Sequence, residues 1–528
     1  MNEANSAICV QPEAGPERGG SGQSAGALPG GKPAGSWAVE ALKWAFSFPA
    51  MLGTFVVGAA FYCGRAFVVD PDLWWHAKTG QTILATHHWP TTDPFSFTVH
   101  GAPWMAYEWG GEVLIGWASR IGGVRALDFL LIGLSAAIMV ALYVLGTIRS
   151  GKSKAGFLAA LALLPLANPS FTLRPQMAGY LFLVLTLIAL ELFRQGKRWA
   201  VWFLPAMMLA WVNTHGSFII GLGTILLYWI CGLAEFRRGG VAAKRWSAKE
   251  RRSLAMVFLL CLAVLPITPY GTRLAVYPFS MAFSQPLNVA TILEWQSMPF
   301  NLLGGKIFLG IVLGIFAAQA AFGLEWRIEE FLLFIFGTAM ACLHIRFILL
   351  FVPFVAPLLA VVVARWMDSY KRAKDQYALN AVIMAGLLAT MVHYSPTRAS
   401  LDAIVATDFP VHAVEYLREH PVAGPMLDSY GFGGYLVGAG YQTFIDGRGD
   451  LFERGGVLGD WTQLASLKPG GLDVLRRYRI QACLLKRDEP LSVALTASPE
   501  WRRVYLDDVA ALYVRASAPL YTDRTPGS

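Results

Sequence analysis

Long apolar runs dominate this chain and limit what it can fold into. A helix needs about 20 consecutive apolar residues to cross the hydrocarbon core of a bilayer. Stretches that approach this length occur at 45–67, 126–147, 155–171, 177–193, 199–213, 217–235, 253–269, 304–323, 329–344, 346–364 and 377–393. Only 15% of the 528 residues are charged, whereas an average soluble domain has about 25%. The sequence therefore predicts an α-helical polytopic membrane protein with about 11 transmembrane helices.

The basic residues between these runs indicate how the protein is oriented. Clusters of lysine and arginine lie at 149–154, 194–198, 237–252 and 365–374, which fall on one side if every run spans. Cytoplasmic loops carry an excess of these residues, so we expect this side to be cytoplasmic. The same rule accounts for the net charge of +8, and no nucleic acid is expected as a partner. The N-terminus is then cytoplasmic and the C-terminal region lies outside.

The two ends of the chain differ from its middle. Residues 1–40 are rich in Gly, Ala, Ser and Pro and predict a disordered cytoplasmic tail. Residues 41–395 form the predicted transmembrane domain. Between 396 and 516, strand-length apolar runs alternate with helical patterns, which predicts a small extracytoplasmic α/β domain, and 517–528 form a second tail. The six scattered cysteines show no CxxC or CxxH spacing and predict neither a disulfide framework nor a zinc site.

The first predicted external loop, residues 68–125, carries two acids beside aromatic side chains. Asp70 and Asp72 directly follow the first apolar run. A carboxylate at a water–lipid boundary can act as a general base or a metal ligand. Apolar stripes at helical spacing predict two amphipathic helices on the membrane surface in this loop. A simple helix start would also explain Asp70, and an interfacial aromatic belt would also explain the tryptophans.

Polar residues from several later loops are expected on the same side as Asp72. The acidic loop and these later loops together contribute His76, Arg174, His215, Glu294, His344, Arg346 and Tyr430. Because they come from many helices, they predict a shared cleft. A guanidinium binds phosphate through a planar fork of donors, although Arg174 and Arg346 would equally fit snorkelling towards lipid headgroups. His215 lies in an Asn-Thr-His-Gly turn and has a structural explanation as well.

This arrangement resembles the GT-C superfamily of membrane glycosyltransferases. Asp70-Pro71-Asp72 looks like the acidic motif of that family's first external loop. Trp89-Pro90, Gly101 and Pro103-Trp104 resemble the run that follows it in bacterial members related to protein mannosyltransferases and lipid A aminoarabinose transferases. Leu73 stands where the mannosyltransferase branch usually has a second acid, so the chain resembles a divergent member.

Two further fragments resemble the oligosaccharyltransferase branch. Thr291-Ile292-Leu293-Glu294 matches its T-I-x-E motif. The segment Asp428-Ser429-Tyr430-Gly431-Phe432, followed by Phe444-Ile445-Asp446-Gly447, is similar to its W-W-D-Y-G motif and the segment beyond. Met426 and Leu427 replace the two tryptophans, so the sequence does not support recognition of a protein glycosylation sequon.

The resemblance implies an enzyme of the bacterial inner membrane that transfers a sugar from a polyprenyl phosphate or diphosphate to an extracytoplasmic glycan, lipid or protein. It implies Asp72 as the general base, with Asp70 as the alternative or as a metal-ligand partner. The residues implied to bind substrate or lipid phosphate are Arg174, Arg346, His344, His76, Glu294, His215 and Tyr430. Mg²⁺ or Mn²⁺ would suit the oxygen ligands Asp70, Asp72 and Glu294, but metal-independent members also exist, so the ion stays open.

Other functions are compatible with the same layout. A non-catalytic GT-C-like scaffold would keep the fold without the activity, and a glycan polymerase or ligase would use the same chemistry. A lipid flippase or transporter is less favoured, because the predicted spans have nearly uncharged centres and no internal repeat is evident. The scaffold and the enzyme are distinguished by whether Asp72, Glu294 and Arg346 meet in one cavity that lipid can reach.

Overall fold

The computed structural model describes residues 36–283 and 285–517. The chain divides into two compact units, Met1–Ala45 and Phe46–Ser528. In the first unit the described residues form one helix, α1 (Ser36–Ala45), so residues 36–40 of the predicted tail are helical. The rest of both predicted tails, residues 1–35 with Cys9 and residues 518–528, lies outside the described part. The remaining five cysteines are free thiols.

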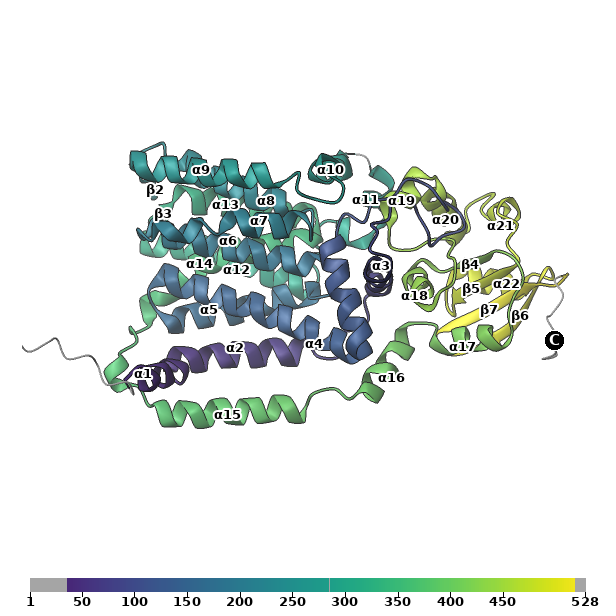
Figure 1. Ribbon diagram of the computed structural model, residues 1–528, viewed down its shortest axis with the longest axis horizontal. Helices are drawn as coiled ribbons and strands as arrows, with labels where there is room; N and C mark the ends of the chain where they lie inside the picture. The colour runs from purple at the N-terminus through teal and green to yellow at the C-terminus, as the bar shows by residue number, and fades with distance from the viewer. Residues whose placement is uncertain (1–35, 284, 518–528) are drawn as a thin grey trace, which may run out of the picture. The chain divides into compact units, whose positions relative to one another are not determined.

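Apolar helices packed side by side form most of the second unit (Figure 1). They are α2 (Phe48–Gly64), α4 (Trp109–Ser150), α5 (Ser153–Ala167), α6 (Gln176–Arg194), α7 (Leu204–Val212), α8 (Phe218–Cys231), α9 (Ala248–Val264), α12 (Leu303–Phe322), α13 (Ile328–Leu343), α14 (Ile348–Val363) and α15 (Tyr377–His393). Helices are favoured here because they satisfy every backbone polar group within one apolar segment. A large buried cluster of leucine, valine, phenylalanine and alanine side chains joins them. We refer to these helices as the bundle.

The number of helices that can span a membrane differs from the sequence prediction. Within the described residues, four helices are long and apolar enough, and the number rises to six if each of two bent helix pairs is one span. The eleven predicted spans are therefore not confirmed. The runs at 199–213 and 217–235, for example, form only the short helices α7, of 9 residues, and α8, of 14 residues. Turn-forming residues such as Asn213 and Gly216 separate them.

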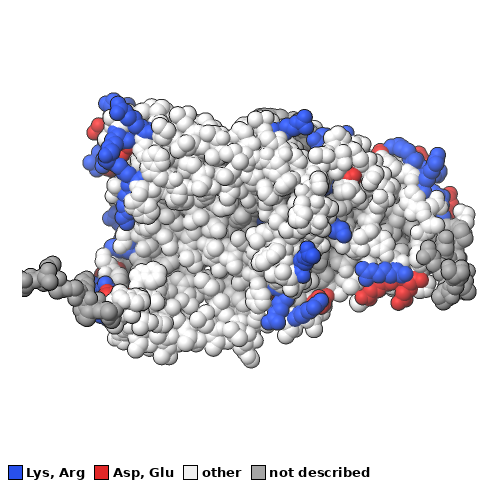
Figure 2. Space-filling model, viewed as in Figure 1, with Lys and Arg blue, Asp and Glu red and all other residues white. Residues whose placement is uncertain are grey.

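Lysine and arginine side chains gather at one end of the bundle, at the left of Figure 2, and the middle carries almost no charge. Contacts between the basic clusters lie there: Lys152 Nζ donates to Ala364 O at 2.8 Å, and the Arg194 guanidinium lies 5.1 Å from the centre of the Trp246 ring. Ion pairs such as Arg194–Glu329 (2.6 Å) join neighbouring helices at this end. A small sheet of β1 (Phe236–Arg238), β2 (Val241–Ala243) and β3 (Trp326–Arg327) lies there too. We call this the basic end.

The opposite end of the bundle carries the loop with the paired acids. α3 (Asp72–Thr86) crosses the first part of α4, and the backbones touch where Gly80 faces Glu112 and Gly116 faces Gly80. α4 breaks at Gly123, whose φ of +58° is a left-handed conformation. The segment from Trp109, predicted as a second surface helix, is thus the first part of a longer element that turns at Gly123. Two short helices, α10 (Thr272–Phe283) and α11 (Pro286–Thr291), lie at this end.

The C-terminal part contains the predicted small sheet with helices around it. Its helices are α16 (Arg398–Asp408), α17 (Val411–Glu419), α18 (Tyr430–Ala439), α19 (Gly449–Arg454), α20 (Val457–Ala465), α21 (Asp473–Arg477) and α22 (Pro490–Ala497). Its strands are β4 (Met426–Asp428), β5 (Ala482–Lys486), β6 (Trp501–Leu506) and β7 (Ala510–Arg515), in the order β4-β5-β7-β6. β4 and β5 are parallel, and the other pairs are antiparallel.

A buried arginine joins this C-terminal part to the acidic loop. Arg448 lies between Asp93 of the loop (2.6 Å) and Asp446 (2.7 Å), and all three side chains are fully buried. The loop backbone continues the contact, since Phe97 N–H donates to Thr443 O at 3.1 Å. α18 packs on α3, where a Cβ on Gly434 would lie 2.1 Å from Pro71 O. The start of α3 is therefore held by the C-terminal part as well as by the bundle.

Candidate active-site pocket

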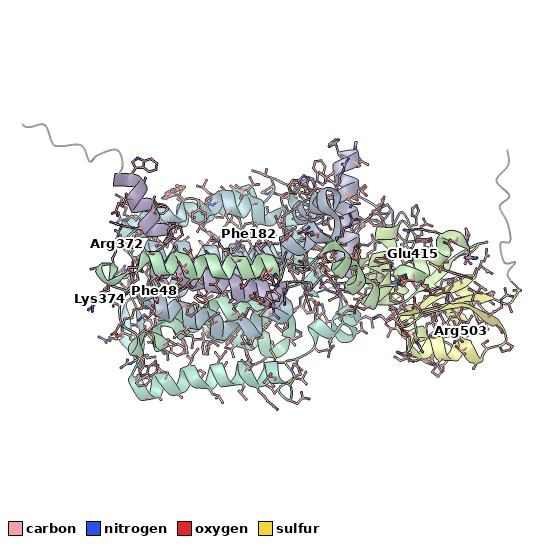
Figure 3. All side chains as sticks on the ribbon, turned by 90° about the horizontal axis from the view of Figure 1, so that it is seen from below. Phe48, Phe182, Arg372, Lys374, Glu415 and Arg503 are labelled. Carbon is pink, nitrogen blue, oxygen red and sulfur yellow. The ribbon has the colours of Figure 1, made fainter. Side chains whose placement is uncertain are left out.

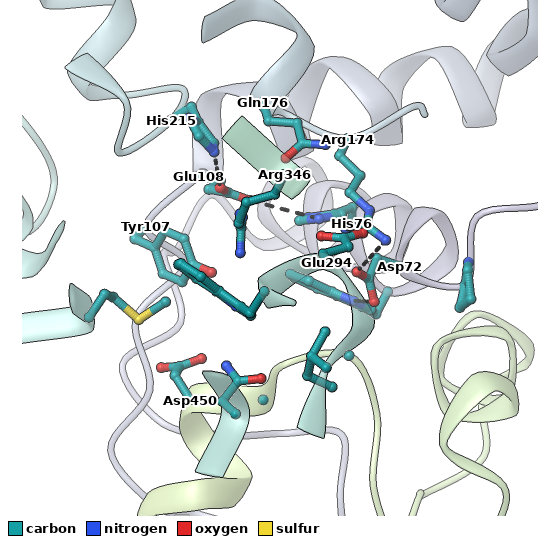
Figure 4. A pocket seen from close by; sticks show the side chains of 18 of the residues that line it. Asp72, His76, Tyr107, Glu108, Arg174, Gln176, His215, Glu294, Arg346 and Asp450 are labelled. Atoms are coloured by element: carbon teal, nitrogen blue, oxygen red, sulfur yellow. Dashed lines mark hydrogen bonds and ion pairs between the residues drawn. The ribbon is translucent and has the colours of Figure 1, made fainter. Parts of the chain in front are cut away.

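A pocket of about 180 Å³ lies where the start of α3, the start of α4 and α19 meet (Figure 4). Seven of the nine residues predicted from the sequence line it: Asp72, His76, Arg174, His215, Glu294, Arg346 and Tyr430. Asp70 is buried directly behind and contacts Arg174. His344 does not line the pocket, and its Nδ1 lies 2.6 Å from the Trp295 carbonyl oxygen. The predicted convergence of Asp72, Glu294 and Arg346 is thus present in the structure.

One guanidinium links the three acids. Arg174 Nε donates to Asp70 Oδ2 at 2.7 Å, one terminal nitrogen lies 3.2 Å from Asp72 Oδ2, and the other donates to Glu294 Oε1 at 2.9 Å. Arg174 directly precedes Pro175 and α6, whereas Glu294 lies in the short 3-10 helix Leu293–Trp295. Segments more than 100 residues apart are therefore joined by a single side chain. Desolvation by burial opposes the charge of Arg174, but the three carboxylates outweigh it and raise its pKa.

Local structure aims Asp72 into the pocket. Its backbone N–H donates to Asp70 Oδ1 at 2.8 Å, which is the turn expected before a helix start. The indole Nε1 of Trp75, one turn later, donates to Asp72 Oδ1 at 3.1 Å. Gly447 packs so closely against this carboxylate that a Cβ there would lie 1.6 Å from Oδ1. Burial raises the pKa of Asp72 to about 6, although Arg174 acts in the opposite direction.

The metal ligands suggested by the sequence do not fit a divalent ion in this arrangement. Asp70 and Asp72 each use both carboxylate oxygens, one towards Arg174 and the other towards a backbone or indole N–H. Glu294 also binds Arg174. A divalent cation could bind these oxygens only by displacing the guanidinium and the N–H donors that already occupy them. In the described part of the chain, no group of three or more His, Cys, Asp or Glu side chains is arranged to hold a metal ion.

A chain of buried histidine and glutamate side chains forms the floor of the pocket. His76 and His215 are among the residues predicted to bind substrate, whereas Glu108 and Glu112 are not. Glu108 lies 3.2 Å from His215 Nε2 and 3.8 Å from His76 Nε2. His76 Nδ1 lies 3.2 Å from Glu112 Oε1. Glu108 and Glu112 are four residues apart at the start of α4, a spacing that places both on one helix face. This spacing is the sequence feature from which the pair of glutamates could have been identified.

Burial determines the charge of this floor. It raises the pKa of Glu108 to about 8 and lowers the pKa of His215 to about 3, with Arg346 contributing to the latter shift. Burial also lowers the pKa of His76 well below its ordinary value. These shifts favour the protonated form of Glu108 and the neutral form of His215 at neutral pH. The other acidic and basic side chains that line the pocket are Asp72, Arg174, Glu294, Arg346 and Asp450.

Residues of the C-terminal part form the wall opposite Arg174. Asp450 lines the pocket, and its Oδ2 accepts hydrogen bonds from the Tyr277 hydroxyl and from Arg454 at 2.9 Å. Gly449 packs against Asn288, where a Cβ would lie 2.9 Å from Oδ1. Tyr430 also belongs to this wall. Asp428, at the start of the motif-like segment, instead lies fully buried and accepts Phe444 N–H at 2.6 Å.

An apolar cavity of about 300 Å³ adjoins the pocket. The two share Gln176, Glu294 and Arg346. Leu166, Met298, Leu302 and Ile348 contribute its apolar wall. The Arg346 guanidinium stacks 4.2 Å from the centre of the Trp295 ring, at the junction between the two spaces. A charged pocket therefore adjoins an apolar space, and an arginine and a glutamate line both.

Comparisons with known proteins complete the description of the site. A scan of protein-family models found no match, and a search of the curated proteins also found none. Among solved structures, the chain is similar to the oligosaccharyltransferase of Archaeoglobus fulgidus tethered to an acceptor peptide, with a TM-score of 0.53 and 12% identity over 90% of this chain and 75% of that one. The apo form of that protein gives a TM-score of 0.52 at 12% identity, over 83% of this chain and 69% of the other.

A second solved protein gives a similar result. The arabinofuranosyltransferase AftD from mycobacteria matches with a TM-score of 0.50 and 15% identity, over 88% of this chain and 41% of that chain. Matches at these identities show a shared fold.

Proposed function

We propose that this chain, which has the fold of the GT-C superfamily of membrane glycosyltransferases, transfers a sugar from a polyprenyl phosphate or diphosphate to an acceptor. The observation that carries the proposal is the meeting of Asp72, Glu294 and Arg346 in one pocket that adjoins an apolar cavity. A lipid-linked sugar has the matching parts, namely a polar headgroup with phosphate and a hydrocarbon chain. A scaffold without activity would not require these groups to meet.

Asp72 is the general base in this proposal. The acceptor hydroxyl or amide attacks C1 of the sugar and passes its proton to the Asp72 carboxylate. The bond between C1 and the phosphate oxygen breaks, and its electron pair leaves with the lipid phosphate. Two donors, Trp75 Nε1 and Arg174, hold the carboxylate in place, and a pKa of about 6 leaves it mostly ionised at neutral pH yet more basic than an ordinary aspartate.

The leaving phosphate gains negative charge as the bond breaks. Arg346 lies where the pocket meets the apolar cavity, and Arg174 lies beside Asp72. Guanidinium groups at these places offset the negative charge that develops on the leaving phosphate, as fixed cationic donors do at phosphoryl-transfer sites. Asp70 fixes Arg174 from behind at 2.7 Å. We assign Asp70 this orienting role, and no step in the proposal passes through a metal ion.

The location of the pocket supports a donor and acceptor outside the cytoplasm. It lies at the end of the bundle away from the basic end (Figures 1 and 2), and the excess of lysine and arginine favours a cytoplasmic location for that basic end. We propose a multi-pass protein of a bacterial inner membrane with its C-terminal part on the far side. The acceptor is a glycan, a lipid or a protein, and joining of lipid-linked glycans uses the same chemistry.

The test is an assay of the purified full-length protein with defined polyprenyl-linked sugars. Mass spectrometry of lipids and glycans from a deletion strain and its parent identifies which sugar and acceptor to use. Asp72→Asn is expected to lower kcat by about 10²–10⁴-fold, because the amide cannot take the proton. The proposal also expects wild-type activity to persist with a chelator present.

The matched control is Asp402→Asn, which removes an exposed carboxylate of α16 outside the pocket. It is expected to leave transfer unchanged. Full transfer by a correctly folded Asp72→Asn protein would contradict the role of Asp72, and absence of transfer by the wild type with the donor identified in cells would favour the scaffold.

A further inference from the structure

A second cavity, of about 530 Å³, lies at the basic end of the bundle. It is enclosed by the starts of α2, α5 and α15 and by the linker that precedes α15. Phe48 and Lys374, two of its lining residues, lie at the same end of the bundle in Figure 3. The proposed sugar transfer takes place at the other end and uses none of these residues. The cavity therefore needs an explanation of its own.

Lysine side chains from two separate parts of the chain converge on this cavity. Lys154 comes from the first turn of α5, whereas Lys371 and Lys374 come from the linker. The linker lysines are exposed. Three ammonium groups around one cavity form a strong attraction for an anion such as phosphate. The hydroxyl-bearing side chains of Ser369 and Tyr370 also line the space.

The two acids of the cavity, Asp368 and Asp375, offset part of this charge and leave the lining with a net positive charge. Asp375 accepts the Phe48 N–H at 3.0 Å and the Asn380 amide at 2.7 Å, and the Tyr370 hydroxyl also donates to it. These bonds tie the start of α2 to the start of α15, so Asp375 has a structural role. Asp368, the other acid among the lining residues, is exposed. The three lysines thus outnumber the two carboxylates by one, and of these carboxylates Asp375 is held by the contacts that join α2 to α15.

The remaining wall is apolar and continues along the outside of the bundle. Phe48 and Met51 of α2 and Leu379 and Ile383 of α15 line the cavity. Beyond it, α15 exposes further apolar side chains, including Val382 (69% exposed) and Val392 (77% exposed). An exposed apolar helix face suits lipid chains. A cationic rim above an apolar groove has the two-part chemistry of a phospholipid.

We propose that this cavity binds an anionic phospholipid, with its phosphate among Lys154, Lys371 and Lys374 and its acyl chains along α2 and α15. The apolar wall favours a lipid over a soluble phosphate, which would leave that wall unused. The three lysines favour an anionic headgroup over a zwitterionic one, whose own cationic group they would repel. This site is independent of the proposed transfer reaction.

The experiment uses the full-length protein in a neutral detergent, titrated with phosphatidylglycerol. Native mass spectrometry measures bound lipid, and thermal unfolding measures stabilisation. Phosphatidylglycerol is expected to bind and raise Tm. The double variant Lys371→Gln/Lys374→Gln is expected to bind it roughly tenfold more weakly or worse, because two of the three cationic groups around the phosphate are lost.

The matched control is Lys197→Gln/Lys249→Gln, which removes the same charge from exposed lysines of the basic end that do not line the cavity. It is expected to retain the wild-type affinity. Equal weakening in both double variants would overturn the site in favour of general surface charge. Equal stabilisation by inorganic phosphate, or by phosphatidylcholine, would overturn the anionic lipid as the ligand. Because no sugar donor is present, the result does not depend on the transfer reaction.

Discussion

At the scale of single residues, the environment of Asp72 determines how the proposed reaction depends on pH. Burial raises the pKa of this carboxyl to about 6, despite the neighbouring Arg174. A general base works only when ionised. We expect kcat/KM to fall about tenfold for each pH unit below 6, because the proton-bound fraction grows by that factor. Above pH 7 this group should have no further effect.

The measurement is a pH profile of kcat/KM for the wild type and for Asp72→Asn. The residual kcat/KM of the variant should not show this fall at low pH. If kcat/KM fell over the same range of low pH in both proteins, the titration would belong to a group other than Asp72.

Gly447 offers a second test at this scale, because it touches Asp72 without donating any chemical group. A Cβ at this position would lie 1.6 Å from Asp72 Oδ1 and 3.0 Å from Trp75 Nε1. Gly447→Ala should therefore displace the carboxylate, and a misplacement of about 1 Å can cost about 10²-fold in rate. We expect a loss of that size in kcat, measured with saturating donor.

Gly459→Ala is the matched control, since the nearest neighbour of a Cβ there is Leu287 at an ordinary 3.7 Å. This variant should keep wild-type activity. Wild-type kcat in Gly447→Ala would mean that the position of Asp72 does not limit the reaction.

At the scale of elements, the acidic loop and the C-terminal part act as one structure because of Arg448. Its guanidinium is buried between Asp93 and Asp446. Removing one partner of a buried ion pair costs about 3–5 kcal/mol, since the remaining charges stay buried. Arg448→Met is expected to destabilise the protein by about this amount, measured by thermal unfolding in detergent.

The comparison variant is Arg487→Met, whose partner Asp508 is fully exposed. A surface pair of this kind contributes about 0–1 kcal/mol. Similar stability changes in the two variants would show that the Arg448 contact does not hold the loop in place.

Several elements were predictable and others were not. The helical bundle follows from the apolar runs, and the start of α3 follows from Asp70-Pro71. The break of α4 at Gly123 and the short α7 were not expected, because hydropathy records where a chain is apolar and not where its backbone turns. The contacts of His76 with Glu108 and Glu112 depend on the close packing of α3 and α4 at Gly80 and Gly116. No local pattern reveals that packing, although the spacing of the two glutamates places them on one helix face.

At the scale of the whole molecule, the proposed function places the hydrocarbon chain of the lipid carrier in the apolar cavity that adjoins the pocket. Gly304, at the start of α12, lines this cavity, and a Cβ there would meet nothing within 4 Å. Gly304→Trp should therefore fold and fill the cavity. We expect it to raise KM for a long-chain polyprenyl-linked sugar by roughly tenfold, as the loss of a small apolar contact area would.

Gly310→Trp is the control on the same helix, because Gly310 has equal space but does not line the cavity. With a donor whose polyprenyl chain is very short, the KM values of the two variants should differ less. An equal rise in KM for both variants, or for both chain lengths, would show that the carrier enters elsewhere.

The sequence by itself determined that this is a helical membrane protein, that its basic clusters share one end, and which polar residues are candidates for one shared cleft. It could do so because apolar length and charge are properties of local segments. Only the tertiary structure decided that Arg174 joins Asp70, Asp72 and Glu294, which are separated by up to 224 residues, that this guanidinium occupies the predicted metal ligands, and that burial raises the pKa of Glu108. Distances between remote segments and the burial of a charge arise from packing, and packing is not written in any single stretch of the chain.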